Sequence, residues 1–197
     1  MFGEVFDFLD AENEAKSAVS RRDVLKVGLG GALAAAVPLI GMGEAEARGR
    51  DGTWRVNFRQ AHTGETFNGV YRVGNKYLPE AFERLNYVLR DFRTKEVFPM
   101  DPRVLDILSM LQSRTGGQQF DVLSAYRSPK TNMNLSRKTS GVAKNSFHMY
   151  GQALDIRSAG VRTSSLRSQA KALKAGGVGY YPRSGFVHID TGSVRSW

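Results

Sequence analysis

The stretch SFHMYGQALDI, residues 146–156, contains one of the three histidines of a 197-residue chain that has no cysteine. His148 is followed seven positions later by Asp155, with Gly151 between them. Glycine permits a tight turn, and side chains alternate along a strand, so Ala153 and Asp155 are expected to share one face. Small Ala153 leaves room beside the carboxylate. The spacing therefore predicts that His148, before the turn, and Asp155, after it, converge on one point.

A second pair of the same residue types lies in the predicted strand 186–191. Val187 and Ile189 are expected to face the core, which places His188 and Asp190 together on the other side. If that side faces the first pair, two imidazoles and a carboxylate meet there.

Two His and one Asp, with a fourth position open to water, form a known ligand set of catalytic zinc sites. Because the chain has no cysteine, a thiolate zinc site and a cysteine nucleophile are excluded, and any metal must bind to His, Asp or Glu. The alternative is structural. A lone His in a strand is more often a hydrogen-bonded residue than a ligand, and a single buried Asp is more often a cap.

The remaining pattern predicts an α+β domain in which helices flank a small, mostly antiparallel sheet. Alternating residues predict a hairpin, followed by three further strands, at 54–60, 65–73, 120–126, 152–157 and 186–191. Apolar residues at helical spacing predict helices over 79–92, over 102–116 with Asp101 as cap, and over 164–175. The polar stretch 127–145 shows no periodicity and is expected to be a loop, which at this length is usually functional or disordered.

The N-terminal residues have the features of a secretory signal. Ser20-Arg21-Arg22-Asp23-Val24-Leu25-Lys26 precedes an Ala/Gly-rich apolar run over 27–42, and Ala45-Glu46-Ala47 fits a cleavage site. The paired arginines resemble a twin-arginine signal, which exports folded proteins. The run is short and glycine-rich for a membrane span. We predict a signal peptide over 1–47, a linker over 48–53 and a domain over 54–197, divided into a hairpin and helices (54–116) and a motif-bearing core (117–197). An uncleaved anchor is the alternative.

Cleavage would make the chain strongly basic. Residues 1–47 hold four of the 28 Lys and Arg residues and eight of the 19 Asp and Glu residues, so the net charge rises from +9 to +13. Such a field attracts polyanions. Because the protein is expected to be exported to the periplasm or beyond, we predict the anionic cell wall as its partner, and neither nucleic acid nor a stable membrane span.

Three ordered motifs resemble a known family, the zinc-dependent D-Ala-D-Ala carboxypeptidases, vancomycin-resistance dipeptidases and murein endopeptidases of peptidase family M15. The family pattern Ser-x-His-x-x-Gly-x-Ala-x-Asp-Ile corresponds to residues 146–156, and its later His-x-Asp to His188-Ile189-Asp190. A third element is the turn Tyr126-Arg127-Ser128-Pro129. The resemblance covers about residues 100–197. Together with His62-Thr63-Gly64-Glu65, it is closest to the exported murein endopeptidases.

The resemblance implies a fold shared with hedgehog and DD-peptidase domains, and zinc bound by His148, Asp155 and His188. It also implies that Arg127 lies near the substrate and stabilises the developing oxyanion, a role that suits a fixed guanidinium. Ser146 would hydrogen-bond the substrate or orient the site.

One position departs from the family pattern. Many relatives carry a glutamate as general base three residues before the second histidine, and this chain has Gly185 there. Asp190 is our candidate for the base. Its alternative role is to hydrogen-bond the ligand His188.

The function predicted is therefore a zinc metallopeptidase that hydrolyses peptide bonds in peptidoglycan as a cross-link endopeptidase in cell-wall remodelling. A D-Ala carboxypeptidase is one alternative, and a non-catalytic zinc-containing wall-binding module is another. A polyanion binder driven by charge alone would leave the three ordered motifs unexplained.

Overall fold

The computed structural model describes residues 49, 51–139 and 142–197, so the predicted leader lies outside the described residues. The strands are β1 (Thr53–Gln60), β2 (Thr66–Val73), β3 (Lys76–Tyr77), β4 (Phe120–Ser124), β5 (Ala153–Arg157), β6 (Gly177–Tyr181), β7 (Phe186–Asp190) and β8 (Arg195–Ser196). The described helices are α3 (Pro79–Val88), α4 (Pro102–Arg114), α5 (Pro129–Lys138), α6 (Thr163–Leu173) and the short 3-10 helix η2 (Phe147–Tyr150). In this part of the chain, no helix is long and apolar enough to cross a membrane.

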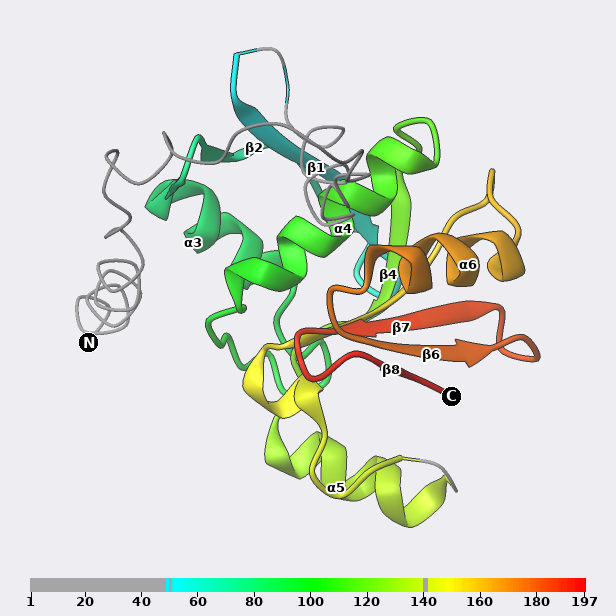
Figure 1. Ribbon diagram of the computed structural model, residues 1–197. Coiled ribbons are helices and arrows are strands. Elements are labelled where there is room, and N and C mark those ends of the chain that lie inside the picture. Colours follow the sequence, from blue (N-terminus) through cyan, green and yellow to red (C-terminus); the bar gives the residue numbers. More distant parts are fainter. Residues whose placement is uncertain (1–48, 50, 140–141) are drawn as a thin grey trace, which may run out of the picture. The chain divides into compact units, whose positions relative to one another are not determined.

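All eight strands form one sheet in the order β3-β2-β1-β4-β5-β7-β6-β8. The pairs β1/β4 and β6/β8 are parallel, and the other pairs are antiparallel. The predicted α+β class with a mostly antiparallel sheet is confirmed. Helices α4 and α6 pack together over the sheet, α4 against β1 and α6 against β6 and β7 (Figure 1).

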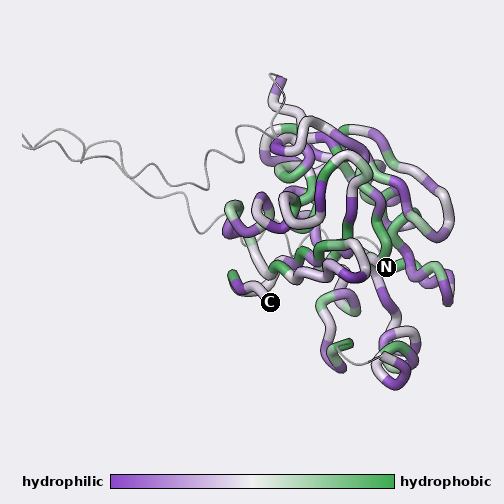
Figure 2. Tube along the Cα trace, turned by 90° about the vertical axis from the view of Figure 1, so that its right-hand side faces the viewer, coloured by the Kyte–Doolittle hydropathy of each residue, from purple (hydrophilic) through white to green (hydrophobic). Residues whose placement is uncertain are grey.

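The core explains which residues form these elements. Leu154 and Ile156 of β5, and Val187 and Ile189 of β7, join the buried apolar cluster. Their alternate neighbours therefore face the other side of the sheet. Apolar segments run through the middle of the domain, and hydrophilic segments predominate in its outer loops (Figure 2).

The predicted first residues of the helices agree with the structure better than the predicted last residues do. Asp101 caps α4, because its side chain accepts a hydrogen bond from Arg103 N at 3.0 Å, and Pro102 occupies the first turn. The first predicted helix, over 79–92, ends instead at Val88. Beyond it Asp91 is buried and accepts hydrogen bonds from the N–H groups of Arg93 and Thr94, which turns the chain.

The expected loop over 127–145 is wrong, because helix α5 occupies much of it. Ser128 caps this helix by accepting from Thr131 N at 3.3 Å, and Pro129 begins it. The buried residues of α5 are Thr131 and Asn132, which are polar. A helix that buries polar residues shows no apolar period in its sequence.

Strand β6 is also absent from the sequence prediction. Its glycines allow close approach, since a side chain at Gly179 would overlap the Trp197 ring. A strand that is selected for small residues lacks the β-branched pattern on which the prediction depends.

Candidate active site

His148 lies in η2, directly before the turn at Gly151. Ser146 caps this short helix, and its Oγ accepts from His148 N at 3.4 Å. Gly151 has a φ of 65°, and a Cβ there would collide with the carbonyl of Pro99. Glycine is therefore required for both conformation and space, and the turn directs the chain from His148 into β5.

Asp155 and His188 are brought together by strand pairing. They are direct partners in the antiparallel β5/β7 pair, and Ala153 faces Asp190 two positions away. The Asp155 Oδ1 atom lies 2.8 Å from His188 Nδ1 and 3.3 Å from His148 Nε2. The third separation, between His148 Nε2 and His188 Nδ1, is 3.2 Å. We call these three residues the ligand cluster.

These distances fit one small metal ion. Nitrogen and oxygen ligands of zinc at ~2.0–2.1 Å in a tetrahedron lie about 3.3 Å apart. Among the described residues, this is the one group of His and acidic side chains with metal-ligating atoms in such proximity. Three ligands leave a tetrahedral position for water or substrate.

Both histidines have their second ring nitrogen occupied. His148 Nδ1 lies 2.7 Å from the carbonyl oxygen of Ala125, and His188 Nε2 lies 3.1 Å from Asp190 Oδ2. In the neutral tautomers that donate from these two nitrogens, His148 Nε2 and His188 Nδ1 carry lone pairs that point to the centre of the cluster. Metal-binding histidines are commonly oriented in this way.

Asp190 lies on the side of the His188 ring away from Asp155. Its side chain is completely buried and, besides His188, accepts hydrogen bonds from Arg195 at 2.7 and 3.0 Å and from the N–H groups of Gly177 and Gly192. Burial opposes ionisation of Asp190, but the hydrogen bonds of His188 and Arg195 lower its pKa well below the usual range. This geometry is that of a carboxylate that holds the His188 ring in place.

The electrostatics of the cluster favour metal binding. Burial lowers the pKa of His148, so its imidazole is neutral near pH 7. Although burial opposes it, the charges and hydrogen bonds of His148 and His188 hold the pKa of Asp155 well below the usual range. Burial lowers the pKa of His188, whereas its hydrogen bonds with Asp155 and Asp190 raise it. The net shift of the His188 pKa is upward. The cluster therefore holds the ionised Asp155 carboxylate beside the His188 imidazole, and a metal ion can replace the proton of that imidazole.

Arg127 lies beside the cluster on the segment that leaves β4. Its backbone N–H donates to His148 O at 3.0 Å, and one terminal nitrogen contacts Ser146 Oγ at 3.4 Å. Its Nε is buried and has no hydrogen-bond partner among the described residues. Burial lowers the pKa of Arg127, which the charge of Asp155 raises. The guanidinium is half-buried beside the cluster, and its terminal N–H groups are suited to donate to a substrate oxygen.

Gly185 lies in the turn between β6 and β7. Its φ is 69°, and its N–H contacts Pro182 O at 3.3 Å. A glutamate at this position would be strained, because side chains disfavour the left-handed region. The left-handed backbone at this position thus favours glycine.

Two residues of the site, Arg195 and Trp197, were not found from the sequence. Arg195 binds Asp190, and the Trp197 ring lies 5.4 Å from the His188 ring. Trp197 Nε1 also donates to Tyr181 Oη at 3.0 Å. Tyr181 stacks on Phe186 at 4.5 Å, so it packs within an aromatic group beside His188. The three motifs do not include Arg195 or Trp197. The one sequence feature that pointed to these contacts was an arginine five positions after Asp190.

An α+β domain that presents two histidines and an aspartate on adjacent strands, with an arginine beside them, has the architecture of a metal-dependent peptidase. Residues 49–197 match the family model described as peptidoglycan L,D-endopeptidase MepK, of the M15 peptidases. The chain belongs to this family.

Curated relatives agree with this assignment. The chain is 41% identical over 143 residues to peptidoglycan L,D-endopeptidase MepK of Escherichia coli, covering 72% of this chain and 79% of that protein. It is also 41% identical over 144 residues to the Haemophilus influenzae protein named probable peptidoglycan L,D-endopeptidase MepK, covering 72% and 77%. The resemblance stated from the three motifs is thereby confirmed.

Proposed function

We propose that this protein is an exported, zinc-dependent endopeptidase that cuts peptide cross-links of peptidoglycan. The observation that carries the proposal is the ligand cluster, with three metal-ligating atoms 2.8 to 3.3 Å apart and both distal ring nitrogens hydrogen-bonded. The family supports the peptidase activity, and its members' names support a bond of the L,D type.

Zinc is the metal that we infer for the cluster. A buried set of two imidazoles and one carboxylate suits zinc among the common divalent ions. When bound, it supplies Lewis acidity toward a carbonyl oxygen and makes water acidic near neutral pH.

The chain's own residues then act in defined ways. The Ala125 carbonyl and Asp190 hold the two imidazoles in fixed orientations, and Arg195 holds Asp190. We assign Asp190 as a positioning residue in preference to the general base, because its oxygens already accept from five donor atoms. Its carboxylate lies behind His188, away from the point where the three ligand atoms meet.

Arg127 and Ser146 are inferred to contact the substrate side of the site. The guanidinium stabilises negative charge that develops on the scissile carbonyl oxygen, since a fixed donor in a half-buried site acts strongly on such charge. Ser146 steadies both Arg127 and the η2 turn through its Oγ. Its role is therefore to orient the site.

Export is the remaining part of the proposal. Its support is the Arg21-Arg22 signal pattern in the sequence, together with a substrate that lies outside the cytoplasm. Peptidoglycan as the partner also fits the +13 charge expected after cleavage at Ala47.

The test is digestion of cross-linked sacculi with the zinc-loaded protein, followed by mass spectrometry of the muropeptides. We expect cross-linked dimers to decrease, monomers to appear, and the cut to fall at L,D bonds. Release of terminal D-Ala alone would instead support a carboxypeptidase. Zinc binding without any cut would support a wall-binding module.

A further inference from the structure

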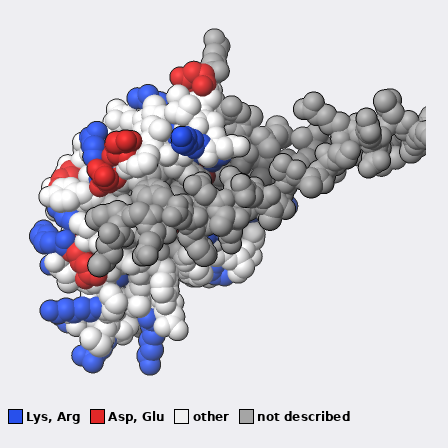
Figure 3. All heavy atoms as spheres, turned by 90° about the vertical axis from the view of Figure 1, so that its left-hand side faces the viewer, with Lys and Arg blue, Asp and Glu red and all other residues white. Residues whose placement is uncertain are grey.

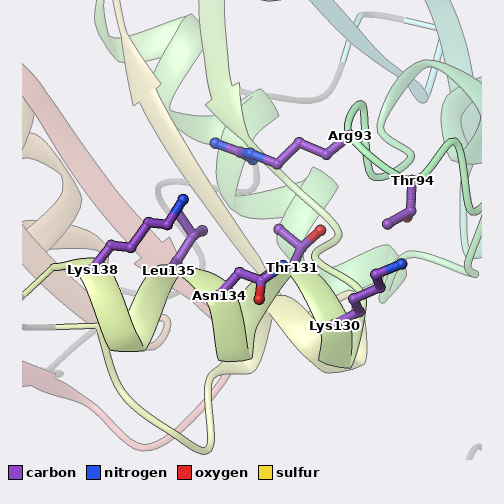
Figure 4. Close-up of a pocket in the computed structure, with 7 residues that line it drawn as sticks. All are labelled: Arg93, Thr94, Lys130, Thr131, Asn134, Leu135 and Lys138. Atoms are coloured by element: carbon purple, nitrogen blue, oxygen red, sulfur yellow. The ribbon is translucent and has the colours of Figure 1, made fainter.

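A pocket outside the ligand cluster lies between helix α5 and the segment 91–95. It is open to solvent and has a volume of about 470 Å³, within the range of small-molecule sites. Three cationic side chains line it, together with three polar ones and one apolar one: Arg93, Lys130 and Lys138, with Thr94, Thr131, Asn134 and Leu135. Figure 4 shows Arg93 and Lys138 extending toward the same part of the pocket, and Lys130 at the end near Thr94. We call this the basic pocket.

The three cations of the basic pocket are not paired with carboxylates of the described residues. No acidic residue lines the pocket. None of Arg93, Lys130 and Lys138 forms an ion pair with another residue in the described ranges. On the face shown in Figure 3, the lowest part of the domain, where α5 lies in Figure 1, carries Lys and Arg side chains without Asp or Glu. Gathering like charges is unfavourable unless an anion binds between them.

The two walls of the basic pocket are fixed to each other beneath it. Asp91 is 1% exposed and accepts from Ser128 N at 3.0 Å and Ser128 Oγ at 2.7 Å, at the start of α5. The same carboxylate accepts from the N–H groups of Arg93 and Thr94. The pocket is therefore held in shape before any ligand arrives, which lowers the entropic cost of binding.

The basic pocket also adjoins the catalytic side of the domain. Helix α5 begins two residues after Arg127, whose backbone N–H donates to His148 O at 3.0 Å. One terminal nitrogen of Arg127 also contacts Ser146 Oγ at 3.4 Å. The segment that leads into α5 is thus attached to the ligand cluster, so a substrate that extends from the cluster past Arg127 reaches α5.

We propose that the basic pocket is a substrate subsite that binds a free carboxylate of the peptidoglycan stem peptide while the scissile bond lies at the ligand cluster. This inference rests on the proposed function for its choice of ligand. Stem peptides carry several free carboxylates, and Arg and Lys donors beside Thr and Asn match such a group. A subsite of this kind selects peptides by their charge, in addition to the general attraction of a basic surface.

The experiment measures binding of an uncross-linked muropeptide with free stem carboxylates to the zinc-loaded full chain, by calorimetry at about 0.15 M salt. The pocket variant is Arg93→Ala, Lys130→Ala, Lys138→Ala. Its matched control is Arg137→Ala, Lys144→Ala, Lys171→Ala, which removes one Arg and two Lys that are exposed and line no part of the pocket. All six side chains are exposed, so both variants are expected to fold, and thermal unfolding checks this. The same muropeptide with amidated carboxylates is the second ligand.

We expect the pocket variant to raise Kd about tenfold and the control to change it about twofold or less. Amidation should weaken binding to the native chain by a similar factor and make little difference to the pocket variant. Equal effects of the two triple variants, no effect of amidation, or no binding by the native chain would each overturn the subsite. Digestion of sacculi by the native chain is read in parallel, so a failure of the peptidase function is seen separately from a failure of the subsite.

Discussion

The ligand cluster and the basic pocket are built in opposite ways. Each ligand side chain of the cluster is largely enclosed and held by a partner, as with His148 on Ala125 O and His188 on Asp190. The basic pocket exposes its three cations and fixes only its backbone walls, through Asp91. A buried, mutually held set of ligands should fail when one member is removed, whereas exposed cations should contribute in smaller and separable steps.

The sharpest contrast concerns removal of a ligand. His188→Ala takes one of three metal-ligating atoms from the cluster and is expected to lower kcat/KM on cross-linked muropeptides about a thousandfold or more, with loss of bound zinc. The measurement is zinc per chain together with the rate of cleavage. His62→Ala is the matched control, because His62 is exposed and stacks on Phe92 outside the cluster. If His188→Ala kept zinc and activity, the cluster would not be the metal site.

Replacing glycine by alanine should cost more stability at Gly151, beside the cluster, than at Gly64, away from it. At Gly151, an added Cβ meets the Pro99 carbonyl in a left-handed conformation, so Gly151→Ala should lower the free energy of unfolding by about 2–4 kcal/mol. Gly64 has a φ of 76° but nothing within 4 Å of an added Cβ, so Gly64→Ala should cost only about 1 kcal/mol. Urea unfolding of both variants gives the comparison. Equal costs would show that the close approach at Pro99 is unimportant.

The two roles considered for Asp190 predict different kinetics. As the residue that positions His188, Asp190→Asn should weaken zinc affinity about 10- to 100-fold, and saturating zinc should restore most of kcat. A general base would give the reverse, with normal zinc affinity and a loss of kcat that zinc does not restore. Zinc titration of activity separates the two outcomes.

The last expected effect concerns the buried Asp91 carboxylate beneath the basic pocket. Burial opposes ionisation of Asp91, but hydrogen bonds from Thr131, Ser128 and Arg93 N lower its pKa to about 2 from 3.8. A lowered pKa stabilises the fold above the unfolded-state pKa, and this contribution is lost as pH falls toward 2. Asp91→Asn should therefore be less stable than the native chain by about 2 kcal/mol at pH 6, with a difference that shrinks below pH 4. Urea unfolding across that range is the measurement, and a difference independent of pH would contradict the assignment.

The ligand cluster could be predicted from the sequence and the basic pocket could not, because the two depend on different kinds of contact. The ligand cluster depends on alternation and one turn, so the positions of His148, Asp155 and His188 in one group could be anticipated from residue spacing. The basic pocket depends on α5, whose buried residues Thr131 and Asn132 are polar and leave no apolar period. The start of α5 is fixed by the hydrogen bond from Ser128 Oγ to Asp91, which lies 37 positions earlier in the chain. A contact of this range cannot be read from local sequence.

The orientation of Asp190 was likewise beyond the sequence. Strand alternation places Asp190 on the same side as His188 but does not say which ring nitrogen faces which carboxylate. That choice depends on Arg195 and on the N–H groups of Gly177 and Gly192, which draw the carboxylate away from the cluster. The orientation of the Asp190 carboxylate thus depends on contacts with residues that lie outside the three motifs.

The most direct measurement is a crystal structure of the zinc-loaded protein with an anomalous difference map at the zinc edge. We predict one strong peak bonded to His148 Nε2, Asp155 Oδ1 and His188 Nδ1, with Asp190 hydrogen-bonded to His188 Nε2 and not to the metal. A peak bonded through His188 Nε2 with Asp190, or a peak away from these three residues, would contradict this prediction.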